Sequence, residues 1–200
     1  MTAQIDDYFM INDMNLSISG ISGKELFDPS SLGLKPVSSC TACWRGYQAV
    51  YAISESRLVL DKFYVGLFTD QDNYIPLDGP PINGVLPTLS KNKNDWFNNH
   101  YIGLDHQLDY TGGLLLTSGF IEELYVHMGF HPAWKYEFVY ELVFSKGILK
   151  EEYDRSKQIA NIRNKIQLSG MNEKSTTALS REEIQDMIDG SFDRTYRIFQ

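Results

Sequence analysis

Alternating apolar and polar positions predict a run of antiparallel strands in the middle of the chain. Over residues 136–144, five apolar side chains share one face that we expect to be buried: Tyr136, Phe138, Tyr140, Leu142 and Phe144. The turn-forming Ser145-Lys146-Gly147 leads into a further strand over residues 148–153. A strand of mixed pattern is also expected before this region, over residues 120–128.

Further strands are expected earlier in the chain. Alternation over residues 47–53, a turn at 54–57 and an apolar run over 58–67 predict a hairpin. The turn-prone pair Asn12-Asp13 breaks the segment 7–18 into one or two short strands. Residues 69–103 show no period and hold four of the seven prolines, so we expect them to form a long loop.

The apolar period becomes helical near the end of the chain. Ile159, Ile162 and Ile166 recur at helical spacing and predict an amphipathic helix over residues 157–168. A capping-box spacing, Ser180 followed by Glu183, predicts a second helix that starts near Arg181. Three later apolar residues continue its stripe, and we expect them to pack on the core: Phe192, Tyr196 and Phe199.

These patterns predict an α+β protein that is mainly β. We expect an antiparallel meander sheet, or a partly closed barrel, with two C-terminal helices. The 200 residues suit one domain, with an antiparallel β part over residues 1–153 and a helical tail over 154–200 packed on it. The 12 tyrosines and 11 phenylalanines favour the same fold class, because aromatic side chains fit pleated, half-buried surfaces.

The net charge of −8 is concentrated in the β part. Residues 1–150 hold 17 acidic and 10 basic side chains, whereas residues 151–200 hold 9 and 8. This balance argues against nucleic acid or an anionic lipid surface as a partner and is compatible with a basic protein partner. No stretch is long and apolar enough for a bilayer, and the acidic start is unlike a secretory signal, so we expect no membrane partner and a cytoplasmic location.

Cys40 and Cys43 form a CxxC spacing, which occurs in redox sites and in zinc ribbons. A zinc ribbon needs a second such pair, and a redox site of this type follows a βαβ pattern. Neither accompanies these cysteines, so we expect two free thiols in a loop. We predict no metal site and no cofactor. The chain also lacks a nucleophile elbow, a Walker loop and a dinucleotide fingerprint, which weakens the case for the usual enzyme classes without excluding a new one.

Five residues are the candidates for a binding site, and none is assigned a catalytic role. Arg45 lies between an aromatic residue and a glycine, so its guanidinium could be presented to a carboxylate, although an internal ion pair is the favoured interpretation. A strand would place Glu123 and His127 on one face, where they could act as metal ligands if His100 or His106 supplied a third. A hydrogen-bonded structural role for His127 is the favoured interpretation. The complete candidate set is Trp44, Arg45, Tyr47, Glu123 and His127.

Three segments, CTACWRGYQAVYAI, PPINGV and YVHMGF, occur in this order. Together they resemble a group of uncharacterised bacterial proteins that have a similar Cys-Trp-Arg-Gly-Tyr segment and Val-His-Met-Gly turn. The resemblance spans roughly residues 36–150 and leaves out the helical tail. It implies that two short runs, 43–47 and 127–129, form one shared feature of the β part, and it implies no activity.

Two hypotheses for function follow. The first is a non-enzymatic protein-binding module, for example an immunity protein that neutralises a basic toxin, because the β part is acidic and no catalytic set is complete. The alternative is an enzyme or small-ligand binder with a pocket around Arg45, Tyr47, Glu123 and His127. A homodimer without another partner would favour the alternative.

Overall fold

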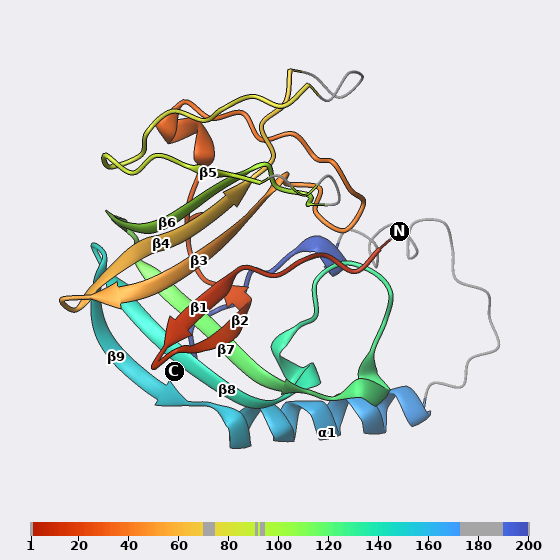
Figure 1. The fold of residues 1–200 in the computed structure, drawn as a ribbon. Helices are drawn as coiled ribbons and strands as arrows, with labels where there is room; N and C mark the ends of the chain where they lie inside the picture. Colours follow the sequence, from red (N-terminus) through yellow and green to blue (C-terminus); the bar gives the residue numbers. More distant parts are fainter. Residues whose placement is uncertain (1, 70–74, 91, 93–94, 173–189, 200) are drawn as a thin grey trace.

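The computed structural model describes residues 2–69, 75–90, 92, 95–172 and 190–199. One large sheet dominates it, with a helix at the outside (Figure 1). The strands are β1 (Tyr8–Ile11), β2 (Met14–Ile21), β3 (Tyr47–Ser54), β4 (Arg57–Val65), β5 (Thr88–Leu89), β6 (Asn99–Gln107), β7 (Gly112–Phe120), β8 (Tyr136–Ser145) and β9 (Ile148–Asp154). The helices are α1 (Ser156–Asn172) and three short 3₁₀ turns, η1 (Pro29–Leu32), η2 (Glu122–Leu124) and η3 (Ala133–Lys135).

The strands pair in the order β3-β1-β2-β7-β8-β9-β4-β6-β5, and β3 also pairs with β4. Seven strands therefore form a ring, and β6 and β5 extend it at β4. All pairs in the ring are antiparallel except β1 with β3, where Tyr8 faces Val50. The predicted α+β, mainly β class is confirmed, whereas the order is more complex than a simple meander.

Local turn chemistry accounts for the hairpins that the sequence predicted. Asn12 and Asp13 join β1 to β2 with positive φ angles of 48° and 64°. Glu55 and Ser56 do the same between β3 and β4, at 49° and 65°. Two consecutive residues with positive φ match the right-handed twist of the strands they connect, so both pairs fix a tight hairpin.

Three predictions in the sheet were wrong. First, the strand that precedes β8 is β7, which ends at Phe120. Most of the expected strand 120–128 is instead irregular chain that contains η2, because the backbone N–H of Ile121 donates to Lys135 O and turns the chain out of the sheet. The strand β6 begins inside the expected loop 69–103. The face of β8 that we expected to be buried is only partly buried, because Phe138 is 49 % exposed and Tyr140 is 39 % exposed.

Apolar side chains fill the inside of the ring as the main core. Its largest members include Phe9, Tyr51, Phe63, Tyr101 and Phe144, all 2 % exposed or less. A smaller apolar layer lies on the outer face of the ring, where α1 and the C-terminal segment 194–199 cover β7 and β8. Its buried members are Leu115, Ala133, Val139 and Ile159.

A buried carboxylate fastens the outer layer. Glu141 of β8 is fully buried, and its carboxylate accepts a hydrogen bond from Arg155 Nε at 2.8 Å. The same carboxylate accepts from the Tyr196 hydroxyl at 3.1 Å and from the Phe199 N–H at 3.3 Å. Tyr196 and Phe199 therefore pack on the sheet as expected, in an extended segment.

The first predicted C-terminal helix is confirmed as α1, and Asp154 caps it by accepting the Ser156 N–H at 2.9 Å. The second, expected from Arg181, lies outside the described residues. No helix in the described part of the chain is long and apolar enough to cross a membrane.

Candidate functional site

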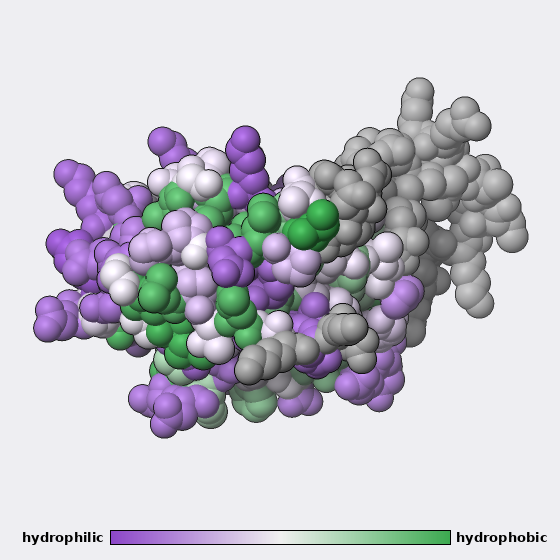
Figure 2. Space-filling model, turned by 45° about the horizontal axis from the view of Figure 1, so that its top comes forward, coloured by the Kyte–Doolittle hydropathy of each residue, from purple (hydrophilic) through white to green (hydrophobic). Residues whose placement is uncertain are grey.

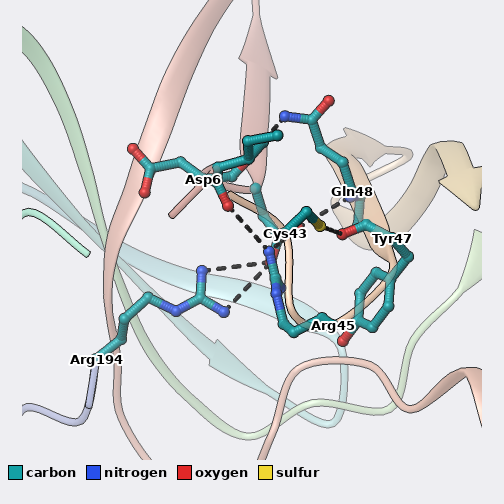
Figure 3. Close-up of polar contacts among 9 residues, drawn as sticks. Asp6, Cys43, Arg45, Tyr47, Gln48 and Arg194 are labelled. Carbon is teal, nitrogen blue, oxygen red and sulfur yellow. Dashed lines mark hydrogen bonds and ion pairs between the residues drawn. The ribbon is translucent and has the colours of Figure 1, made fainter. Parts of the chain in front are cut away.

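A buried ion cluster joins the start of the chain to the start of β3 and to the C-terminal segment. Asp7, 2 % exposed, accepts hydrogen bonds from Arg45 Nη1 at 2.6 Å and from the Ala49 N–H at 2.9 Å. Both terminal nitrogens of Arg194 lie 3.3 Å from the same carboxylate. In Figure 3 the side chain of Arg194 enters from the side opposite Tyr47. The internal ion pair expected for Arg45 is therefore present.

Aromatic rings enclose the two guanidinium groups. The Arg45 guanidinium carbon lies 4.8 Å from the Tyr47 ring centroid and 5.5 Å from that of Phe130, and Arg194 lies 4.5 Å from Phe130. These contacts keep water away and strengthen the attraction to Asp7. Burial alone would raise the pKa of Asp7, but the charges of Arg45 and Arg194 hold it below its ordinary value.

The pKa of the neighbouring Asp6 is shifted in the opposite direction. Burial raises the pKa of Asp6 to about 6, although a hydrogen bond from Ser17 and the charge of Arg194 oppose the shift. Its carboxylate points away from both guanidinium groups in Figure 3. The fold therefore shifts the two neighbouring carboxyl groups in opposite directions: it raises the pKa of Asp6 and lowers that of Asp7.

This difference gives a pH-dependent prediction for Asp6→Asn. Because the folded pKa of Asp6, about 6, is above its ordinary value of 3.8, ionisation destabilises the fold as the pH rises through this window. We expect the variant to match the wild type at pH 3.5 and to exceed its free energy of unfolding by roughly 1–3 kcal/mol at pH 7.5. Urea unfolding at both pH values measures this, with the exposed Asp13→Asn as control. An equal difference at both pH values would contradict the assignment.

The five sequence candidates do not share one location. Arg45 and Tyr47 lie together in the buried cluster. Trp44 is 52 % exposed and stacks on Phe192 with 4.7 Å between ring centroids. His127 is exposed, and its Nδ1 pairs with the Tyr125 hydroxyl at 2.8 Å.

Glu123, the fifth candidate, lies at a different feature, which we call the loop pocket. This pocket of about 540 Å³ lies between residues 123–135, after β7, and residues 190–194 of the C-terminal segment. Phe130, which packs on Arg45 and Arg194, is one of its walls. The loop pocket and the buried ion cluster are therefore neighbours that share Phe130 and Arg194.

The N-terminal residues connect the two runs that carry the family resemblance. The Gln4 side chain accepts the N–H of Trp44 at 3.1 Å, and the Gln4 N–H donates to Gly129 O at 2.8 Å. The Gly129 N–H donates to Thr2 O. Residues 43–47 and 127–129 thus lie on either side of segment 2–7, and most of their contacts with it are structural hydrogen bonds.

Both cysteines are free thiols in the structure. Cys43 is buried, and its thiol donates to Tyr47 O at 3.1 Å. Burial raises the pKa of this thiol, although Arg45 opposes the shift, so Cys43 is a weak nucleophile. Among the described residues, no three His, Cys, Asp or Glu side chains are grouped as a metal site.

An open groove at one end of the ring is the largest of the described pockets, and sequence reasoning did not identify it. The turn of the β3–β4 hairpin, at Ser56, lies beside the start of β9, and β4 pairs with β9 only through Arg57 and Ile148. The rest of β9 continues to Asp154 without β4 beside it, and this leaves the opening. Among the described residues, no strand covers the ring interior beyond that point. We call this opening of about 910 Å³ the ring groove.

Aromatic and aliphatic side chains line the ring groove, and carboxylates lie at its β9 side. Two aromatic residues of the lining are among the most exposed of the sheet, Phe138 at 49 % and Tyr140 at 39 %, whereas the Tyr153 ring lies 4.3 Å from the Arg155 guanidinium carbon. Further lining residues come from the β1–β2 hairpin and β9, namely Ile11, Met14, Asn15, Leu16, Glu152 and Asp154. No Lys, Arg or His is among the described lining residues, so the groove is apolar with an acidic side.

Other elements also expose large apolar residues, for example Leu86, Trp96 and Val126. On the face that Figure 2 brings forward, separate green groups lie among purple and white residues. Scattered apolar residues of this kind are normal on a protein surface, whereas a contiguous apolar surface marks an interaction site. The ring groove is therefore the stronger candidate for binding a partner.

Comparisons with known proteins identify no relative: no family model, no curated protein and no solved structure matches this chain. The function must therefore be argued from the sites themselves.

Proposed function

We propose that this protein is a cytoplasmic, non-enzymatic binding module that holds a basic protein partner in the ring groove. The observation that supports the proposal is the combination of exposed aromatic side chains with carboxylates and no cations along the groove. An immunity protein that neutralises a basic toxin is a concrete form of such a module. The free thiols of Cys40 and Cys43 are compatible with a reducing compartment.

The groove has the two features that such a partner requires. Aromatic anchors such as Phe138 and Tyr140 supply most of the binding energy in many interfaces, because they bury a large area with few rotatable bonds. Glu152 and Asp154 would attract Lys or Arg side chains of the partner, and the net charge of −8 would speed encounter with a basic protein. The same charges would repel acidic competitors.

Charge reversal at the groove tests this proposal. We expect a tagged chain to retain one stoichiometric basic protein from its native cell, observed as the mass of the intact complex. Glu152→Lys should weaken binding about tenfold, and added salt should weaken wild-type binding further, because the attraction is electrostatic. The matched control is Glu25→Lys, an exposed acidic residue that does not line the groove.

An apolar variant completes the experiment. Tyr140→Ser should reduce binding, whereas Leu86→Ser, at a residue 71 % exposed on a distant loop, should not. The proposal would be wrong if both groove variants bound the partner as tightly as their controls, or if the chain associated only with itself.

A further inference from the structure

The loop pocket contains a buried lysine that has no acidic partner among the described residues. Lys135 ends the 3₁₀ turn η3, is 6 % exposed and lines the pocket. Its Nζ lies 3.5 Å from His131 Nδ1 and 5.5 Å from the centroid of the Trp134 ring. No carboxylate of the described residues lies within ion-pair distance of the amine.

This isolation is unusual for a buried cation. Removal of an ammonium group from water costs several kcal/mol unless a negative charge or hydrogen bonds offset it. Burial lowers the pKa of Lys135, and no nearby charge opposes the shift. The pKa of His131 is lowered as well, first by burial and then by Lys135, which favours the neutral imidazole, and a neutral imidazole offers Lys135 no counter-charge.

The other charged groups of the pocket are already engaged or lie at its edge. Arg194 pairs with Asp7. Asp193 accepts the Thr195 N–H at 2.7 Å. Glu123 is exposed to solvent. Lys135 is therefore the cation of the pocket that a negatively charged ligand can pair with.

The remaining walls define the rest of the ligand. Trp134, Phe130, Met128 and Leu124 give the pocket an apolar lining. Its volume of about 540 Å³ is that of a small-molecule site. A ligand that matches these walls carries one negative group and an aromatic or aliphatic body.

We propose that the loop pocket binds a small organic carboxylate, with the Lys135 ammonium group as its charge partner and Trp134 and Phe130 against its apolar body. The carboxylate supplies the counter-charge that the described residues do not provide, and forms a charge-assisted hydrogen bond to Nζ. This site shares no residue with the ring groove, so either can be tested without the other.

A pair of probes that differ only in charge tests the site. We expect 3-phenylpropanoate to bind saturably, observed as quenching of tryptophan fluorescence and as NMR shifts of residues 124–135. The neutral 3-phenylpropanamide should bind about ten- to a hundredfold more weakly, because it lacks the charge that Lys135 requires. Failure of the carboxylate to bind the wild-type chain would overturn the proposal.

The variant Lys135→Met removes the charge and keeps the length of the side chain. It should fold, since it relieves a buried cation, and it should bind the two probes with equal affinity. The control Lys24→Met, at an exposed lysine outside the pocket, should retain the wild-type preference for the carboxylate. An undiminished preference in Lys135→Met would assign the anion site to another residue and overturn the proposal.

Discussion

Asp7→Asn is expected to lower the free energy of unfolding by about 3–5 kcal/mol, the effect of removing one partner from a buried ion pair. The asparagine oxygen can still accept the Ala49 N–H, but Arg45 and Arg194 lose their shared counter-charge. Such a loss is a large fraction of the roughly 5–15 kcal/mol that stabilises a typical domain. Urea unfolding followed by circular dichroism measures it at neutral pH.

The control for Asp7 is Arg194→Met, which leaves the shorter Arg45–Asp7 pair of 2.6 Å intact and should cost far less. The pKa of Asp7 is lowered in the fold, so its contribution is present above the ordinary value of 3.8 and is lost only as the pH falls through the lower folded value. A loss below about 1 kcal/mol for Asp7→Asn would show that the cluster is not a main source of stability.

Glu141→Gln is expected to cost about 3 kcal/mol and to loosen the C-terminal segment. The glutamine keeps one acceptor but places an amide donor and no charge beside Arg155, whose Nη2 lies 2.8 Å from the carboxylate. The contacts from Tyr196 and Phe199 weaken with it. Trypsin should therefore cleave after Arg194 or Arg197 faster than in the wild type.

Glu137→Gln is the matched control, because it is an exposed glutamate on the same strand. Its unfolding free energy and its cleavage by trypsin should both equal those of the wild type. Equal cleavage of the Glu141→Gln and Glu137→Gln chains would show that the Glu141 carboxylate does not hold residues 194–199 in place.

Local signals in the sequence were sufficient for some of these features. The turn segments Asn12-Asp13 and Ser145-Lys146-Gly147 consist of residues that favour turn conformations, so the hairpins that they connect could be predicted. Helical spacing of Ile159 and Ile162 likewise predicted α1, whose apolar side packs on the sheet. These features depend on residues that are close in the chain.

Features set by distant contacts could not be predicted in this way. Ring closure rests on pairs such as Ser17 with Thr117 and Arg57 with Ile148, which leave no local pattern. The ring groove forms because β4 and β9 pair only at Arg57 and Ile148. The alternation of apolar residues in β8 therefore could not predict that Phe138 and Tyr140 are exposed.

The buried charges were only partly predictable. An internal partner for Arg45 was expected, but nothing local distinguishes Asp7 from the other acidic residues. Lys135 gave no signal at all, because its burial depends on the fold of residues 121–135 around it. His127 and Glu123 were considered together on an expected strand that does not form, and only Glu123 lines the loop pocket.

The proposed function rests on the ring groove as the surface that binds a partner, and hydrogen exchange of the complex tests this claim most directly. We predict that the captured partner slows amide exchange in residues 11–16, 138–140 and 150–154, which border the groove. The outer edge of β9 beyond Leu149 has no strand beside it among the described residues, so its amides should show the largest change. Unchanged exchange in these three segments, together with protection elsewhere on the molecule, would contradict the account.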